Sequence, residues 1–93
     1  MLGNSEEKYG QALDALNKSD YRASFEIFKP LAEKGDARAQ FYLGFLYRIG
    51  RGVNQDLQKA YHWYLLAAEQ GYAEAQYKIG LMYYKGQVVP RDY

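Results

Sequence analysis

The stretch that decides the fold of this chain is GDARAQFYLGFLYRIGRGVNQD at residues 35–56, which recurs 36 residues later, at 71–92, as GYAEAQYKIGLMYYKGQVVPRD. Nine positions are identical in the two copies, whereas average amino-acid usage would give roughly one or two by chance. Four of the others exchange similar apolar residues, as Phe41 does with Tyr77. A fixed period of this length is typical of stacked repeats, in which each unit is too small to bury its own apolar face.

Apolar side chains recur at three- and four-residue spacing along the chain, which predicts helices and no strand. Asp20, Asp36 and Asp56 are of a type that caps helix starts, and Gly35 and Gly71 are of a type that ends helices. The helices expected from these signals are 6–17, 21–34, 36–49, 57–70 and 72–85. We therefore expect a single all-α domain over 1–93. Its repeat units are expected at about 5–35, 36–71 and 72–93, with the last unit incomplete.

Glycine recurs in the middle of two expected helices, at Gly44 and Gly80, where it costs about 1 kcal/mol relative to alanine. Close approach of the paired helix would compensate for this cost, because a missing side chain lets two backbones come together. For Gly44 we expect this contact to be made through Ala67 and Ala68.

Pro30 lies well inside the helix expected at 21–34. Proline cannot donate the backbone hydrogen bond that an internal helical position requires. We therefore expect a kink or a break near 26–30.

Length and composition exclude several classes of protein. Ninety-three residues allow one domain, near the small end of what folds unaided. Twelve Lys and Arg balance 11 Asp and Glu, so we expect neither a nucleic-acid partner nor attraction to a membrane surface. No apolar run is long enough to span a membrane, and no cysteine is present to form disulfides or thiolate metal sites. No signal peptide is visible, which leaves two compartments open: the cytoplasm or, if a signal peptide was removed, the periplasm or the exterior.

No set of residues in the sequence supports catalysis, a cofactor or a metal ion. His62 is the only histidine, and without cysteine its co-ligands could only be carboxylates or amides, so we expect it on the surface. Ser5, Ser19 and Ser24 lack a nucleophile-elbow motif. The glycine-rich loop at 50–53 lacks the preceding strand and the following Lys-Ser/Thr of a phosphate-binding loop. We therefore expect no enzyme.

The residues from Ala39 to Gly71 follow the pattern A-x3-L-G-x2-Y-x2-G-x-G-V-x2-D-x2-K-A-x2-W-x3-A-A-x2-G. This pattern fixes many residue types at fixed offsets, and it resembles the Sel-one-like repeat, a relative of the tetratricopeptide repeat. A second copy departs from it at Ile79 and Val88, and the first unit has Ala12 where a helix glycine is expected. The resemblance covers nearly the whole chain.

The resemblance implies a right-handed α/α superhelix, or solenoid, of antiparallel helix pairs, with five helices in about two and a half repeats. It also implies an adaptor for protein or peptide partners, of a kind found often in bacterial proteins and in eukaryotic quality-control complexes. In this superfamily, groove-facing side chains recur near i, i+3, i+7 and i+10 on the first helix of each pair, along one helical stripe. Carried onto this sequence, the groove residues are Glu6, Tyr9, Leu13 and Leu16, then Arg38, Phe41, Phe45 and Arg48, then Glu74, Tyr77, Leu81 and Tyr84.

Two functions follow, and both remain open at this point. The first is an interaction scaffold that binds a peptide or partner protein in the concave groove, since arginine beside aromatics is typical of binding hot spots. We favour a binding role for Arg38, Arg48 and Tyr84, whereas packing between repeats is the alternative for the groove aromatics. The second function is self-association as a homodimer through the last helix, whose apolar face lacks the covering helix of its counterpart. The residues expected on that face are Tyr77, Ile79, Leu81, Met82 and Tyr83.

Overall fold

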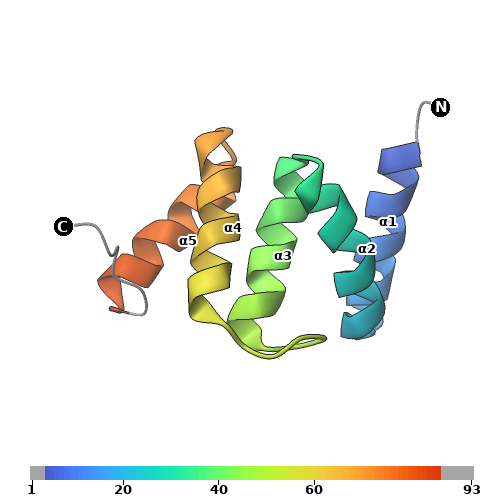
Figure 1. Ribbon diagram of the computed structural model, residues 1–93, viewed down its shortest axis with the longest axis horizontal. Helices are drawn as coiled ribbons and strands as arrows, with labels where there is room; N and C mark the ends of the chain where they lie inside the picture. Colours follow the sequence, from blue (N-terminus) through green and yellow to red (C-terminus); the bar gives the residue numbers. More distant parts are fainter. Residues whose placement is uncertain (1–3, 87–93) are drawn as a thin grey trace.

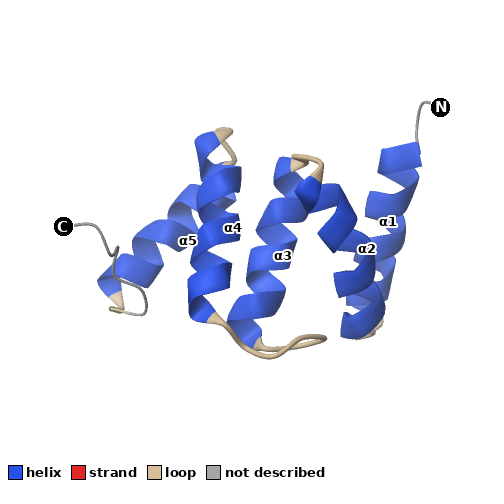
Figure 2. Ribbon diagram, in the orientation of Figure 1, coloured by secondary structure: helices blue, strands red, loops and turns tan. Residues whose placement is uncertain are grey.

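The computed structural model describes residues 4–86, and every regular element in that range is an α-helix (Figures 1 and 2). The helices are α1 Asn4–Asn17, α2 Tyr21–Glu33, α3 Ala37–Ile49, α4 Leu57–Glu69 and α5 Ala73–Tyr84. Their ends lie within two residues of the predicted ends. The all-α prediction is therefore confirmed for this part of the chain.

The helices follow one another in chain order along the long axis of the molecule, from α1 to α5 (Figure 1). The main contacts join α1 to α2, α2 to α3, α3 to α4 and α4 to α5. The resulting body is elongated, with extents of 44 × 25 × 17 Å. Because each helix packs mainly on its neighbours in sequence, the arrangement is a helical solenoid.

Three aspartates begin helices as the sequence predicted. The carboxylate of Asp20 accepts a hydrogen bond from the backbone N–H of Ala23, and that of Asp56 accepts one from Lys59. Asp36 accepts two, from the N–H groups that follow it at the start of α3. Tyr72 occupies the equivalent position before α5 and provides no side-chain cap. Each aspartate satisfies backbone donors that the helix cannot satisfy itself.

A repeated glutamine ties each new helix pair to the pair before it. Gln40 lies near the start of α3 and donates from Nε2 to the carbonyl of Ala32, near the end of α2, at 3.2 Å. Gln76 makes the same bond to Ala68, near the end of α4, at 3.1 Å. Gln40 is 5 % exposed, so its amide would be costly to bury unpaired. The identity of these two residues in the sequence repeat thus reflects a shared structural bond.

Pro30 does not break α2, which runs without interruption through Glu33. Of the two alternatives predicted near 26–30, the break is therefore wrong, and the kink stays a prediction. Both Pro30 and Glu26 are exposed, so water can reach the Glu26 carbonyl that loses its helical donor. A solvated position lowers the cost of an internal proline.

Close approach at Gly44 is confirmed, although the contacting residues differ from those expected. A β-carbon placed at Gly44 would lie 2.9 Å from the Tyr64 ring and 3.1 Å from the carbonyl oxygen of Ala60. The nearest contacts are thus with Ala60 and Tyr64 of α4 and not with Ala67 and Ala68. A β-carbon at Gly80 would meet none of the described residues within 4 Å.

The loop after α3 returns to contact α2 through Gly52. Its φ angle is +75°, in the region that favours glycine, and an added β-carbon would lie 2.4 Å from the carbonyl oxygen of Tyr21. The side chain of Arg51 also lies over the Tyr21 ring, 5.7 Å from its centroid. Val88, the counterpart of Gly52 in the second copy, lies outside the described residues.

Alanine at the two mid-helix glycines should have opposite effects on stability. Gly80→Ala should raise the free energy of unfolding by up to about 1 kcal/mol, because only helix propensity changes. Gly44→Ala should lower it by about 1 kcal/mol, and Gly44→Leu by more, because the added carbons force α3 and α4 apart. Urea unfolding followed by circular dichroism measures both. Equal shifts for the two alanine variants, or an unchanged melting temperature for Gly44→Leu, would contradict the close packing.

Gly52→Ala should destabilise the chain more than Gly71→Ala. Both positions have positive φ, which costs an alanine about 1 kcal/mol, but nothing lies within 4 Å of a β-carbon at Gly71. The clash with the Tyr21 backbone should add about 1–3 kcal/mol at Gly52 alone. The difference in unfolding free energy between the two variants measures the contact. Identical losses would mean that the loop is not held against α2.

Candidate partner-binding groove

The predicted groove residues lie on α1, α3 and α5, and contacts between these helices join them. Arg38 on α3 reaches Glu6 and Tyr9 on α1, and Phe41 on α3 contacts the ring of Tyr72 just before α5. The half-buried members are Tyr9, Leu13, Leu16, Arg38, Phe41, Phe45, Arg48 and Leu81. The exposed members are Glu6, Glu74, Tyr77 and Tyr84.

In the N-terminal half, Arg38 is engaged by neighbours within the chain. Its Nη1 and Nη2 donate to the two carboxylate oxygens of Glu6 at 3.1 and 3.0 Å. Its guanidinium lies 4.0 Å from the centroid of the Tyr9 ring. It also donates to both carboxylate oxygens of Asp36, at 3.3 and 3.1 Å. A bidentate ion pair stacked on an aromatic ring fixes the guanidinium, so Arg38 joins α1 to α3.

The ionisation of this cluster follows from the same contacts. Burial tends to raise the pKa of Asp36, but hydrogen bonds from the Arg38 side chain and the Ala39 backbone outweigh it and lower the pKa below its usual value. The pKa of Arg38 is raised, mainly by its hydrogen bonds to Asp36 and then to Glu6. Burial, followed by the nearby Tyr42, raises the pKa of Tyr9 to about 12. The cluster therefore stays charged as a closed ion pair at neutral pH.

Phe41 occupies the middle of the surface and packs between repeats. Its ring lies 5.2 Å from that of Tyr42, 5.6 Å from Tyr64 and 5.3 Å from Tyr72, measured between centroids. Of the three rings only Tyr72 belongs to the next unit, so that contact is of the inter-repeat kind that the sequence left open for this residue. Because the Phe41 ring contacts three other rings, less of its surface is open to a partner.

In the C-terminal half, large aromatic side chains remain open to solvent. Tyr84 is 89 % exposed and Tyr77 is 66 % exposed. On α3, the guanidinium of Arg48 lies 5.7 Å from the Phe45 ring centroid and joins no ion pair within residues 4–86. This half offers aromatic surface and unpaired positive charge, in contrast to the closed cluster around Arg38.

Two further residues of this half were missed in the sequence, namely Tyr64 and Lys78. Burial raises the pKa of Tyr64, and the nearby guanidinium of Arg48 opposes the rise. Neither Tyr64 Oη nor Arg48 Nε has a hydrogen-bond partner of good geometry among the described residues, although both atoms are buried. Burial and then the charges of Arg48 and Lys85 lower the pKa of Lys78. Lys78 falls between the groove spacings, but its repeat counterpart is the aromatic Tyr42, and that exchange was visible in the sequence.

The face expected for self-association is smaller than predicted. Met82 is 1 % exposed and belongs to the hydrophobic core, so its placement on an open face was wrong. Ile79 is half-buried against the same core. Tyr83 is 47 % exposed and shares a hydrogen bond of 3.1 Å with the Tyr61 hydroxyl on α4. The apolar side of α5 turns toward α4, and mainly tyrosines remain outside.

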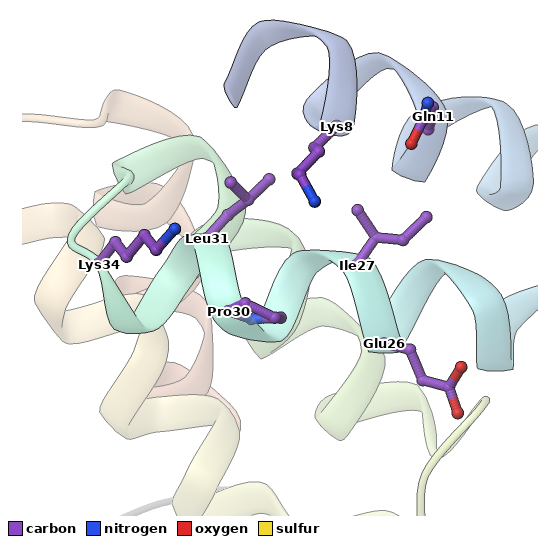
Figure 3. A pocket seen from close by; sticks show the side chains of 7 residues that line it. All are labelled: Lys8, Gln11, Glu26, Ile27, Pro30, Leu31 and Lys34. Carbon is purple, nitrogen blue, oxygen red and sulfur yellow. The ribbon is translucent and has the colours of Figure 1, made fainter. Parts of the chain in front are cut away.

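A small pocket lies between α1 and α2, away from the groove stripes. Figure 3 shows Lys8 from α1 pointing toward the space beside Ile27 and Leu31 of α2. Pro30 closes the pocket on the α2 side. Its volume of about 160 Å³ is below the roughly 300–1,000 Å³ typical of small-molecule sites.

Within residues 4–86, no three His, Cys, Asp or Glu side chains are grouped so that they could hold a metal ion. His62 is exposed beside the Trp63 ring. None of the described helices has the length and apolar character needed to cross a membrane.

Solved structures with a similar fold come from bacteria. The protective antigen c5321 of uropathogenic Escherichia coli, described as displaying an SLR fold, is 35 % identical, with a TM-score of 0.86. The match covers 98 % of this chain and 20 % of that chain. A Sel1 repeat protein from Oxalobacter formigenes is 34 % identical, with a TM-score of 0.76, over 90 % of this chain and 66 % of the other. Both support the solenoid of helix pairs.

Similar proteins of known name are much longer. The Arabidopsis thaliana ERAD-associated E3 ubiquitin-protein ligase component HRD3A is 36 % identical over 68 % of this chain and 9 % of its own length. The human protein sel-1 homolog 2 is 48 % identical over 46 % of this chain and 6 % of its own length. The chain thus spans less than a tenth of either relative.

The family model of the Sel1 repeat matches three consecutive segments of this sequence, 1–36, 37–72 and 73–93. Together they account for the whole chain, in agreement with the repeated Gln40 and Gln76 bonds and the stacked helices. The chain belongs to the Sel1 repeat family.

Proposed function

We propose that this chain is a protein-interaction module that binds a peptide or partner protein on the surface carried by α3 and α5. The observation that carries the proposal is the pair of open aromatics on α5, Tyr77 and Tyr84, together with the Arg48 guanidinium on α3, which joins no ion pair within residues 4–86. Tyrosine and arginine are enriched among residues that dominate binding energies. Exposed apolar surface of this kind marks sites that another molecule covers.

The N-terminal half is a weaker candidate for the contact. Glu6 and Asp36 already satisfy the guanidinium of Arg38, and Tyr9 stacks against it. A partner would have to break these bonds before it could use Arg38. Binding is therefore assigned to the C-terminal half of the predicted groove, with Phe45, Arg48, Tyr77, Leu81 and Tyr84 as its members and Glu74 at its edge.

The names of similar proteins agree with an interaction role. HRD3A is described as a component of a ubiquitin-protein ligase. The rat DAP3-binding cell death enhancer 1, 41 % identical over 48 % of this chain and 9 % of its own length, is described as binding another protein. These descriptions belong to those proteins, and they favour an interaction module over an enzyme. No catalytic role is proposed for this chain.

Removal of the open aromatics should weaken peptide binding. A random peptide library displayed on phage should enrich binders to the wild-type chain, and Tyr77→Ser with Tyr84→Ser should weaken their affinity at least tenfold. Tenfold corresponds to about 1.4 kcal/mol, within the range of one hot-spot residue. Gln58→Ala with His62→Ala, two exposed positions on α4, is the matched control and should bind normally. Enrichment no better than an empty support, or binders indifferent to the tyrosine changes, would refute the assignment.

Self-association is the second candidate, because Tyr77, Tyr83 and Tyr84 all remain exposed on α5. If two chains bury this surface against each other, light scattering at high micromolar concentration should report a dimer mass. Tyr83→Ser with Tyr84→Ser should then return the chain to a monomer. A monomer for the wild-type chain under these conditions rules out the dimer and leaves the peptide-binding surface unaffected.

A further inference from the structure

The pocket between α1 and α2 joins an apolar wall to unpaired positive charge. Ile27, Pro30 and Leu31 of α2 form the wall. Figure 3 shows Lys8 pointing into the space beside Ile27 and Leu31, and Lys34 extending toward Leu31 from the end of α2. Both lysines are exposed, and neither joins an ion pair between described residues.

The acidic charge beside this pocket is already paired. Among the described residues that line the pocket, Glu26 is the only acidic one. Its carboxylate lies 3.5 Å from the Arg22 side chain and points away from Lys8 in Figure 3. The two lysines are therefore the charge that the pocket presents to a ligand.

The lysines stand where the second helix pair has glutamines. Lys34 at the end of α2 corresponds to Gln70 at the end of α4, 36 residues further on. The turn between α1 and α2 is four residues shorter than the loop between α3 and α4, so α1 corresponds to α3 at a distance of 32 residues. Lys8 therefore corresponds to Gln40.

In the second pair, these glutamines hold the end of the preceding helix. Gln70 donates from Nε2 to the carbonyl oxygen of Gly35 at 2.9 Å and to Oε1 of Gln40 at 3.0 Å. Gln40 donates in turn to the carbonyl oxygen of Ala32 at 3.2 Å. Carbonyl groups at the C-terminus of a helix carry partial negative charge. In the second pair, this place is thus occupied by main-chain oxygens.

Lysine changes the kind of oxygen that the first pair can bind. An amide both donates and accepts, whereas an ammonium group only donates, so Lys8 and Lys34 cannot bond to each other as Gln40 and Gln70 do. Ammonium groups bind an ionised acceptor about twice as strongly as a neutral one. A C-terminal carboxylate is a main-chain group that carries a full negative charge, so it suits this pair of lysines.

The volume of the pocket indicates which side chain accompanies the carboxylate. About 160 Å³ is close to the roughly 150 Å³ of an engineered apolar cavity that binds benzene, so the pocket has room for one side chain such as leucine. Leu31 is 3 % exposed and Ile27 is half-buried, so the core holds the wall in place. In the second pair, the bulkier Trp63 stands in place of Ile27.

We propose that this pocket binds the C-terminal residue of a partner polypeptide, with its apolar side chain against the wall formed by Ile27, Pro30 and Leu31. The carboxylate of that residue lies between Lys8 and Lys34, whose ammonium groups donate hydrogen bonds to it. The site lies between α1 and α2, so it does not depend on the function proposed for the surface on α3 and α5.

The test is an NMR titration of the isotope-labelled chain at low salt with three hexapeptides. The first is a Gly/Ser peptide that ends in leucine with a free carboxylate, the second is the same peptide with a C-terminal amide, and the third is a free acid that ends in serine. The first should bind at least tenfold more tightly than either of the others. Amide signals around Ile27 and Leu31 should shift, whereas those of Tyr77 and Tyr84 should not.

Three variants separate the parts of the site. Lys8→Gln with Lys34→Gln introduces the residues of the second pair, so it should keep its melting temperature and lose the preference for the free carboxylate. Lys18→Gln with Lys29→Gln removes the same charge at exposed positions outside the pocket and should keep the preference. Ile27→Trp introduces the second pair's residue into the wall and should lose the preference for leucine over serine.

Several outcomes overturn the site. One is equal affinity for the acid and the amide, another is a preference that survives the Lys8 and Lys34 changes, and a third is no binding of any peptide at millimolar concentration. If the leucine peptide shifts the signals of α5 and not those of α1 and α2, the pocket is wrong and the surface on α3 and α5 gains support. If isocaproate binds as tightly as the leucine peptide, the pocket takes free apolar acids and not the end of a polypeptide.

Discussion

Burial of a ring at each helix junction is the interaction on which the rest of this structure depends. Phe28 and Tyr64 are both fully buried, and each occupies the same place in successive helix pairs. An isolated helix of 13 residues cannot shield either ring from water, because every side chain on a single helix points outward. Each pair therefore becomes stable only against its neighbours. The bonds of Gln40 and Gln76 and the glycine contact at Gly44 set how closely and in which register the helices meet.

The same repeat geometry produces two unlike ends. In the N-terminal half, Arg38 is held by carboxylates and a tyrosine ring, so charge and aromatic surface are used within the chain. In the C-terminal half, Arg48 and Lys78 have no acidic partner among the described residues, and Tyr77 and Tyr84 stay open. Contacts within the chain account for the charged and aromatic groups of the N-terminal half. They do not account for those of the C-terminal half. This contrast is the reason to look for a partner on α3 and α5.

Local signals in the sequence predicted most of the fold. The period of 36 residues, the apolar spacing and the capping aspartates gave five helices with ends correct to within two residues. The apolar spacing and the capping residues depend on positions close together in the chain, and the period is visible directly in the sequence. A kink or a break was expected at Pro30, and the break was wrong, since local rules do not reveal that Glu26 and Pro30 are exposed. The sequence placed the groove residues on α1, α3 and α5. It could not show which of these side chains are already bound to other side chains of the same chain.

The sequence by itself therefore determined that this chain is a stack of helix pairs, because helical periodicity and capping are encoded over a few residues. The tertiary structure alone decided the partners of individual side chains. It paired Arg38 with Glu6, placed Met82 in the core and left Tyr77 and Tyr84 exposed. Each of these outcomes depends on the rotation and approach of a second helix. Those quantities are set by packing between segments far apart in the chain, which no local pattern records.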